Sequence, residues 1–285
     1  MRRALLVVSV FVVALLGVSV FVTARLFAPA PERPPPVITK ACTVSTATGE
    51  VRLNADQMAN AATIAAVGLV RQLPERAVVV ALATALQESG LKNIDYGDRD
   101  SVGLFQQRPS QGWGTPEQIL DPRYSAGKFY SSLVKVRDWE GLRVTEAAQR
   151  VQRSAFPEAY EKWADESTVL AEALTGRASG AVSCTQIGEP SQRGMPATEA
   201  LGNGLRADWG DGVTVQNADA VGLVVNVGGS DSPTGWRYAH WIVAHSAAHG
   251  VARVRYLNHE WNADGAGWRQ IAITDDHIVA EVFQP

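Results

Sequence analysis

The first feature of the hydropathy pattern is an apolar run from Ala4 to Ala24, flanked by arginines on both sides. A run of about twenty apolar residues can cross the hydrocarbon core of a bilayer as one helix. It is also longer than the apolar core of an ordinary signal peptide. We therefore expect residues 1–25 to form an uncleaved transmembrane signal anchor, with cleavage after Ala28 or Ala30 as the alternative.

Two stretches of turn-forming composition divide the rest of the chain. Residues 26–41 contain the sequence APAPERPPPVITK, which predicts an extended proline-rich spacer. A stretch rich in Gly and Ser ends in a second linker at residues 185–196. These boundaries predict one domain over residues 42–184 and another over residues 197–285.

In residues 42–184 the apolar positions recur mostly at helical spacing. Asn54 is suited to be an N-cap, and Gln57 three residues later completes a capping-box pattern. Pro74 interrupts this helix and begins a second one, for which Gly90 is a good C-terminal stop. We expect a mostly α domain.

The pattern changes in residues 197–285. The segments GLVVNV, ARVRYL and HIVAEVF alternate as strands do, and GWRYAHWIVAHSAAHG predicts a helix between the first two. The predicted fold class is therefore multidomain, α and α+β. It consists of a single N-terminal transmembrane helix, a mostly α domain and a small α+β C-terminal domain.

Composition adds little that is specific. The chain is 46% hydrophobic and has a formal net charge of −3, so no general basic character indicates a nucleic-acid partner. One membrane-spanning segment cannot enclose a transport pathway. Nothing in the sequence indicates a cofactor.

The strongest chemical candidate is Glu88, in the segment ALQESG at the end of the second helix. It follows the apolar run from Ala77 to Leu86, so hydrocarbon should lie beside it, and burial favours the protonated carboxyl. The negative C-terminal end of the helix has the same effect. Such a carboxyl suits protonation of a glycosidic oxygen, and the alternative is a solvated residue at a helix end.

This site resembles the lysozyme-like superfamily, in particular the branch of soluble lytic transglycosylases and goose-type lysozymes. The resemblance covers roughly Leu53 to Ala173 and rests on ESG at Glu88 to Gly90, on Ser101, on GLFQQ at Gly103 to Gln107 and on AAQRVQRSAFPEAYEKW at Ala147 to Trp163. It implies cleavage of peptidoglycan glycan strands with Glu88 as the catalytic acid. It also implies that Tyr160 is a site tyrosine, although Tyr160 could equally be a packed aromatic.

The segment after Glu88 carries the candidate substrate-binding residues. Ser101 belongs to the resemblance, and Gly103 would let the backbone approach a sugar closely. Gln106 and Gln107 offer amides to hydroxyl and N-acetyl groups, and Phe105 offers an apolar face to a sugar ring. The alternative is that Phe105 belongs to the core and that the glutamines are solvated.

Three aspartates, Asp95, Asp98 and Asp100, lie in the loop between these motifs. A glycosidase that uses water or a covalent intermediate needs a second carboxylate about 5 to 10 Å from the acid. The transglycosylases that the chain resembles use one glutamate, because the acetamido group and the 6-hydroxyl of the substrate take the other roles. The sequence leaves both routes open, and the aspartates could instead form a polar turn or a cation-binding loop.

The chain has two cysteines, Cys42 and Cys184, one on each side of the lysozyme-like region. In an oxidising exterior they predict one disulfide that joins the two ends of this domain. The alternative is two unpaired thiols.

All five histidines fall in residues 197–285, and His245 and His249 share one helix face. Two imidazoles do not make a structural zinc site, so we expect solvent-facing histidines and no metal. This part weakly resembles zinc-dependent D-Ala-D-Ala carboxypeptidases, but Val279 stands where a second histidine should follow His277. We expect a degenerate module that binds a wall component or an envelope protein.

Together these features predict a single-pass protein of the cell membrane, with most of the chain outside the cell. The predicted activity is cleavage of the bond between N-acetylmuramic acid and N-acetylglucosamine. The alternative function is a non-catalytic scaffold that binds the cell wall or docks a partner protein of the envelope.

Overall fold

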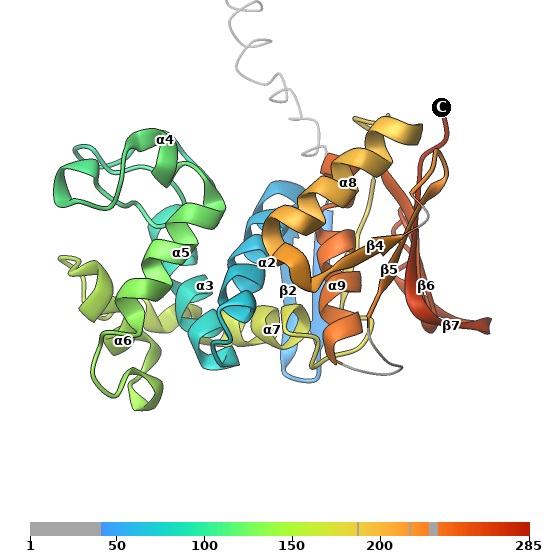
Figure 1. The fold of residues 1–285 in the computed structure, drawn as a ribbon. Helices are drawn as coiled ribbons and strands as arrows, with labels where there is room; N and C mark the ends of the chain where they lie inside the picture. The colour runs from blue at the N-terminus through green and yellow to red at the C-terminus, as the bar shows by residue number, and fades with distance from the viewer. Residues whose placement is uncertain (1–40, 187, 217, 228–232) are drawn as a thin grey trace, which may run out of the picture. The chain divides into compact units, whose positions relative to one another are not determined.

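Helix α2 (Ala55–Val70) is packed between two groups of helices in the computed structural model, which describes residues 41–186, 188–216, 218–227 and 233–285 (Figure 1). On one side it contacts α3 (Glu75–Ser89) and α5 (Pro122–Leu133), and on the other α8 (Gly194–Trp209) and α9 (Pro233–Ala244). The remaining helices are α4 (Pro116–Ile119), α6 (Val144–Gln152), α7 (Ala164–Leu174) and α10 (Ser246–His249). The described residues also form four short 3₁₀ helices, η1 (Pro109–Gln111), η2 (Trp139–Gly141), η3 (Glu161–Trp163) and η4 (Gly210–Gly212).

The start of α2 has the predicted capping box. The Asn54 side chain accepts a hydrogen bond from the Gln57 backbone N–H at 2.9 Å, and the Gln57 side chain accepts one from the Asn54 N–H at 2.9 Å. The Gln57 amide also donates to the Gly90 carbonyl at 2.8 Å. The start of α2 is thereby tied to the end of α3.

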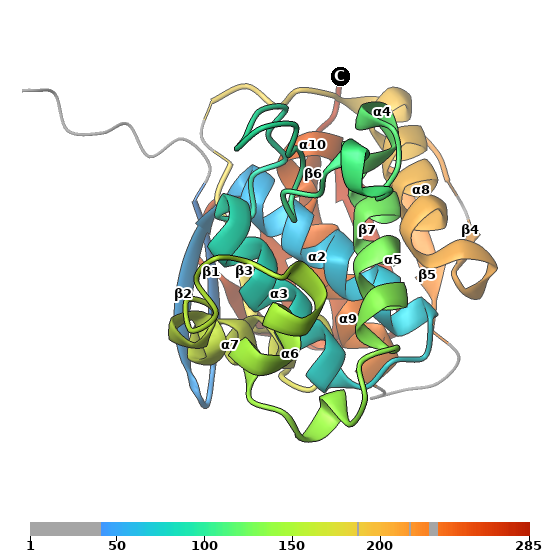
Figure 2. The same ribbon diagram turned by 90° about the vertical axis from the view of Figure 1, so that its left-hand side faces the viewer.

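Helix α3 follows Pro74 and ends at Gly90, whose φ of 62° is left-handed, as the glycine predicted. Every residue from Ala77 to Leu86 is buried, which confirms the expected apolar run. The chain therefore emerges from the core only in the last turn, where Glu88 lies. Figure 2 shows α6 beside α3, and the end of α6 reaches the same region.

A three-stranded antiparallel sheet, ordered β2-β1-β3, joins the beginning and the end of the chain segment from Ala41 to Cys184. Its strands are β1 (Ala41–Thr46), β2 (Gly49–Asn54) and β3 (Val182–Cys184). Cys42 and Cys184 face each other in the register of β1 and β3 and form a disulfide. The predicted disulfide is confirmed.

The last part of the chain forms a second antiparallel sheet, ordered β4-β5-β7-β6. Its strands are β4 (Thr214–Gln216), β5 (Gly222–Asn226), β6 (Val251–Asn262) and β7 (Trp268–Val282). The three segments predicted as strands lie in β5, β6 and β7, and the predicted helix gives α9 and α10. Helices α8 and α9 pack between this sheet and α2 (Figure 1).

His240, on α9, connects the C-terminal part of the chain with the segment from Ala41 to Cys184. Its Nδ1 lies 2.8 Å from the Ala173 carbonyl of α7, and its Nε2 accepts a hydrogen bond from the Ala181 N–H at 2.9 Å. The ring must be neutral to satisfy both partners. Burial lowers the pKa of His240 to about 4, so the ring remains neutral in the folded protein.

These contacts correct the predicted fold class. The described residues form one compact α+β unit with two antiparallel sheets, and not a mostly α domain beside a separate small α+β domain. The physical reason is that α2 buries residues around most of its circumference and needs helices on both sides.

The transmembrane helix that was included in the predicted fold class is not supported either. No helix in the described part of the chain has the length and hydropathy needed to cross a bilayer. The segment for which a transmembrane helix was predicted, Ala4 to Ala24, lies outside the described residues.

The disulfide gives the first testable prediction. Because it closes a loop of 142 residues, replacing both cysteines by alanine should lower the free energy of unfolding by about 2 to 4 kcal/mol. Urea unfolding of the two proteins measures this difference. A reducing agent should destabilise the wild type to a similar extent and leave the variant unchanged; equal stability of oxidised wild type and variant would contradict the prediction.

A second prediction concerns acid. The unfolded chain protonates His240 below about pH 6.5, whereas the folded chain does so only near pH 4. Stability from this residue is therefore complete above pH 6.5 and is lost as pH falls to 4, by about 3 kcal/mol. His240→Asn should flatten this part of the curve of unfolding free energy against pH. The control His277→Asn, at a histidine that is only half-buried, should keep the wild-type slope. A wild-type slope in His240→Asn would refute the prediction.

Candidate active site

The carboxyl group of Glu88 is held at the end of α3 by two side chains from later in the chain. The Tyr160 hydroxyl donates to Glu88 Oε1 at 2.6 Å, and the Gln152 amide donates to the same oxygen at 3.1 Å. Among the described residues, Oε2 has no hydrogen-bond partner. The carboxyl is half-buried and has one occupied and one free oxygen.

Tyr160 immediately precedes η3 and is completely buried. Burial, followed by the nearby Glu88 carboxylate, raises the pKa of its phenol well above the ordinary value of 10. The hydroxyl therefore keeps its proton and acts as a donor to Glu88. The structure thus brings together two of the residues that the sequence singled out, seventy-two positions apart.

Gln152 is a site residue that the sequence did not single out. It is the last residue of α6, and its amide donates both to Glu88 and to the Phe105 carbonyl, the latter at 2.8 Å. From the sequence alone, a glutamine at the polar end of an amphipathic helix is expected to face solvent. Its role depends on the packing of α6 against α3, which periodicity does not reveal.

The segment from Gly103 to Gln107 forms a tight turn beside Glu88. Val102 and Gln107 close it through a pair of backbone hydrogen bonds of 3.0 and 3.1 Å. Gly103 has a φ of 79°, and a Cβ there would lie 2.8 Å from the Ile119 carbonyl. The sequence predicted that a glycine here lets the backbone approach a sugar closely. In the structure the close approach is to the backbone of the protein itself, at Ile119.

Three of the candidate substrate-binding residues, in or just before this turn, are buried. Phe105 is 0% exposed and stacks on Phe129 with ring centroids 4.8 Å apart. Gln107 is 2% exposed and donates to the Ser125 carbonyl at 3.1 Å, and Ser101 is 7% exposed. These side chains are therefore packed inside the protein.

Gln106 is the candidate of this segment that stays partly accessible. Its φ is 46°, and its amide donates to the carbonyls of Tyr96 and Gly103 at 3.3 and 3.2 Å. The Tyr96 side chain is 70% exposed beside it. Gln106 thus fixes the loop that carries Tyr96.

The three aspartates of that loop have different surroundings. Hydrogen bonds from Ser110, and then from Arg108, hold the pKa of Asp100 well below its usual range. The Asp100 carboxylate accepts from the Ser110 N–H at 2.8 Å and meets Arg108 at 2.7 Å. Asp95 and Asp98 are exposed. Asp100 is therefore part of the loop's framework.

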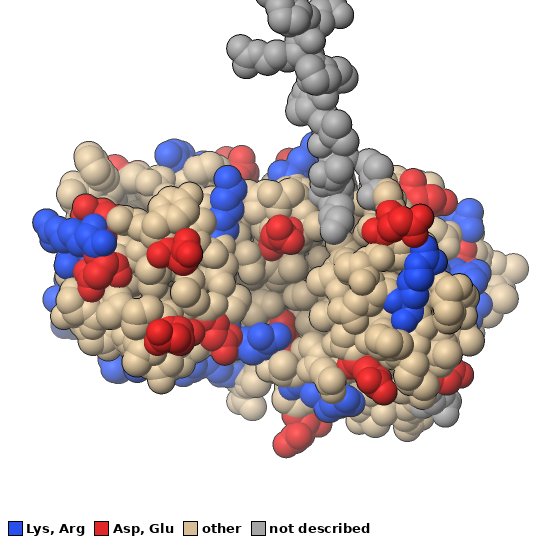
Figure 3. Space-filling view, turned by 90° about the horizontal axis from the view of Figure 1, so that it is seen from above, with Lys and Arg blue, Asp and Glu red and all other residues tan. Residues whose placement is uncertain are grey.

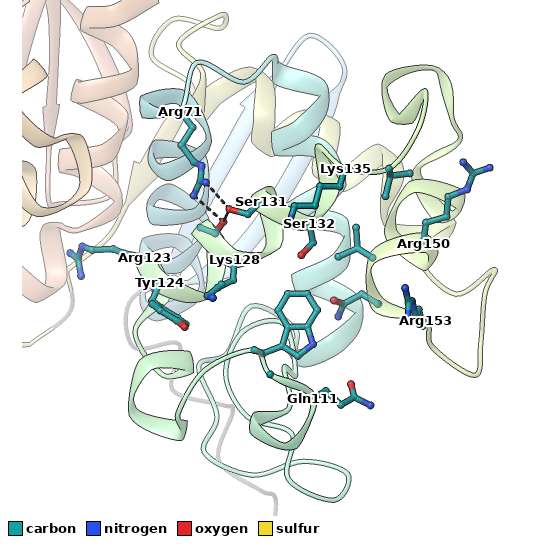
Figure 4. Close-up of a pocket in the computed structure, with 16 residues that line it drawn as sticks. Arg71, Gln111, Arg123, Tyr124, Lys128, Ser131, Ser132, Lys135, Arg150 and Arg153 are labelled. Atoms are coloured by element: carbon teal, nitrogen blue, oxygen red, sulfur yellow. Dashed lines mark hydrogen bonds between the residues drawn. The ribbon is translucent and has the colours of Figure 1, made fainter.

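A cleft of about 1200 Å³ adjoins the site through Gln152 (Figure 4). Gln152 lines it, whereas Glu88 does not, so the glutamine stands between the cleft and the carboxyl. Aromatic lining comes from Trp113 and Tyr124. The basic lining residues are Arg71, Arg123, Lys128, Lys135, Arg150 and Arg153.

The expectation of solvent-facing histidines is wrong. His245 is 8% exposed and stacks on Trp241 at 3.9 Å, and burial lowers its pKa to about 4. Its Nδ1 lies 2.9 Å from the Trp241 carbonyl, and His249 stacks beside it. Across the described ranges, no three His, Cys, Asp or Glu side chains are grouped to hold a metal ion.

Comparisons with known proteins add no family to this geometry. The chain matches no protein-family model, and no curated protein matches it. The interpretation of the site therefore depends on the residues around Glu88.

The burial of Phe105 gives a third testable prediction. Phe105→Ala should lower the free energy of unfolding by about 3 to 5 kcal/mol, because it opens a cavity in the core. The control Phe156→Ala, at a side chain 72% exposed, should change it by less than about 0.5 kcal/mol. Urea unfolding measures both. Equally small losses would mean that Phe105 is not packed in the core in solution.

Proposed function

We propose that this protein cleaves the β-1,4 bond between N-acetylmuramic acid and N-acetylglucosamine in peptidoglycan, with Glu88 as the proton donor. The observation that carries the proposal is the arrangement of the Glu88 carboxyl, with two donors on Oε1 and a free Oε2. The resemblance of ESG, Ser101 and GLFQQ to the lysozyme-like superfamily supports it.

The two donors decide which oxygen carries the acidic proton. Because Tyr160 and Gln152 both donate to Oε1, that oxygen must act as an acceptor, and the proton of the neutral carboxyl belongs on Oε2. A substrate that lies against Oε2 presents its glycosidic oxygen to this proton. The fixed orientation of the carboxyl contributes to the rate by removing a rotational search.

The reaction then proceeds as a general-acid cleavage. Glu88 gives its proton to the glycosidic oxygen while the bond from that oxygen to C1 of the muramoyl sugar breaks. In a transglycosylase the 6-hydroxyl oxygen of the same sugar bonds to C1, and in a hydrolase a water oxygen does so. The attacking oxygen loses a proton to the Glu88 carboxylate, which restores the acid.

The surroundings of the three aspartates favour the substrate-assisted route. Asp100 is engaged by Arg108 and Ser110, and Asp95 and Asp98 are exposed loop residues. Among the described residues, Glu88 is the one carboxylate in the hydrogen-bond network that it forms with Tyr160 and Gln152. One glutamate, with the acetamido group of the substrate, suffices for this chemistry.

The proposed place of action is outside the cytoplasm. Peptidoglycan lies there, and a disulfide persists in an oxidising compartment. The buried pair of Cys42 and Cys184 supports this location.

The fourth prediction tests the acid. Glu88→Gln keeps the size of the side chain but cannot give a proton, so cleavage of purified peptidoglycan should fall by at least about 100-fold. Mass spectrometry of the released muropeptides measures the rate, and anhydro or reducing ends identify the route. Thermal unfolding should show that the variant remains folded.

Matched controls accompany this variant. Glu166→Gln makes the same change at an exposed glutamate of α7 and should leave the rate unchanged. Asp95→Asn and Asp98→Asn should each leave measurable turnover if the substrate-assisted route operates. Equal activity of Glu88→Gln and wild type would refute the assignment. A wild type that binds glycan without cleaving it would favour the scaffold function instead.

A further inference from the structure

Strand β2 is the outermost strand of the three-stranded sheet, and no strand in the described part of the chain pairs with its outer edge. The sheet order is β2-β1-β3, and Figure 2 shows β2 at the margin of the fold. The backbone groups along such an edge form a template for a further strand. Glu50 and Arg52 lie on this edge, and their side chains are 50% and 78% exposed.

The register of the sheet decides which backbone groups of β2 face the open edge. The Ser45 N–H of β1 donates to the carbonyl just before β3, at 2.9 Å. Neighbouring residues of a strand direct their backbone groups to opposite sides, so Val44 bonds instead to its cross-strand partner Val51. It follows that Glu50 and Arg52, on either side of Val51, direct their N–H and C=O groups outward.

The two outward residues carry opposite charges, which makes this edge complementary to itself. If β2 of a second copy lies antiparallel to it and centred on Val51, Glu50 faces Arg52 of that copy, and Arg52 faces its Glu50. Each facing pair then exchanges two backbone hydrogen bonds, as in an antiparallel ladder. A shift by two residues would place Glu50 against Glu50, or Arg52 against Arg52. Charge therefore selects one register.

The rest of the molecule is compatible with this arrangement. A two-fold axis at Val51 relates the two strands, so both copies use the same surface and the assembly closes as a dimer. Val51 and Leu53 are buried on the inner face of β2, and the two sheets join with their apolar faces on the same side. The chain has a formal net charge of −3, and acidic and basic side chains are interspersed on the face shown in Figure 3. Long-range repulsion between two copies is therefore small.

The contact between the two charges within one chain does not compete strongly with this pairing. Arg52 Nε lies 2.9 Å from Glu50 Oε1, but both side chains are exposed, and an ion pair of this kind contributes little. We propose that β2 pairs with β2 of a second copy of this chain and forms a two-fold symmetric dimer. The interface is short, so the expected dimer is weak, with a Kd in the micromolar range. The inference does not rest on the proposed cleavage.

Amide hydrogen exchange of the full chain, in a mild detergent, tests the interface directly. The N–H groups of Glu50 and Arg52 should exchange quickly in dilute protein and at least about tenfold more slowly when the dimer is saturated. The Val51 N–H is bonded to β1 in both states, so it should exchange slowly at both concentrations. Sedimentation at the same concentrations measures the fraction of dimer. A chain that stays monomeric would overturn the proposal, and so would a dimer in which the Glu50 and Arg52 amides still exchange quickly.

Charge reversal tests the register. Arg52→Glu places Glu50 opposite a second glutamate at both symmetric positions, so it should weaken dimerisation at least about tenfold. Glu50→Arg/Arg52→Glu restores opposite charges in the same register and should return the Kd to within about threefold of the wild-type value.

A matched control makes the same charge change elsewhere. Arg206→Glu, at an exposed position of α8, should leave the Kd unchanged. Thermal unfolding checks that all three variants are folded, as substitution of exposed residues allows. A folded double reversal that does not recover the dimer would mean that these charges do not set the register, and it would overturn the proposal.

Discussion

The structure depends on the burial of one helix, α2, around most of its circumference. Its buried positions include Thr63, Ile64, Ala65 and Ala66, four consecutive residues that point to different sides of the helix. Small alanines let neighbouring helices approach closely, and only a narrow face, which includes Asp56, is left for solvent. Helices α3 and α5 cover one side and α8 and α9 the other, so the two halves of the chain share one core.

Three ties secure this shared core near the point where the two halves of the chain meet. The disulfide fixes β3 against β1, and His240 joins the backbone just before β3 to the end of α7. Asp208 forms the third tie, because its carboxylate accepts a hydrogen bond from Thr63 of α2 and from Trp241 of α9, both at 2.7 Å. These polar groups are costly to bury unless each finds its partner, so they define one arrangement of the helices.

The candidate site is assembled on this frame from three separate segments. Helix α3 supplies Glu88, the end of α6 supplies Gln152, and the residue before η3 supplies Tyr160. The turn at Gly103 packs closely against Ile119. The Phe105 carbonyl of this turn accepts a hydrogen bond from Gln152 and so helps to hold Gln152 in place. The Glu88 carboxyl is thus oriented by groups whose own positions follow from the core, as its proposed role of proton donor requires. The same geometry places the basic cleft beside Gln152, at the edge of the site.

The sequence by itself determined the features whose causes are local. The capping box at Asn54, the stop at Gly90 and the alternation in β5 to β7 depend on neighbours within a few residues, and each was predicted. The tertiary structure alone decided which side chains meet. The partnership of Gln152 with Glu88, the burial of Phe105 and Gln107, and the use of His240 and His245 inside the core depend on contacts between distant segments. An amide or imidazole has the same local pattern whether it faces water or a buried partner, so only the packing of α9 and α6 against α2 and α3 could settle its role.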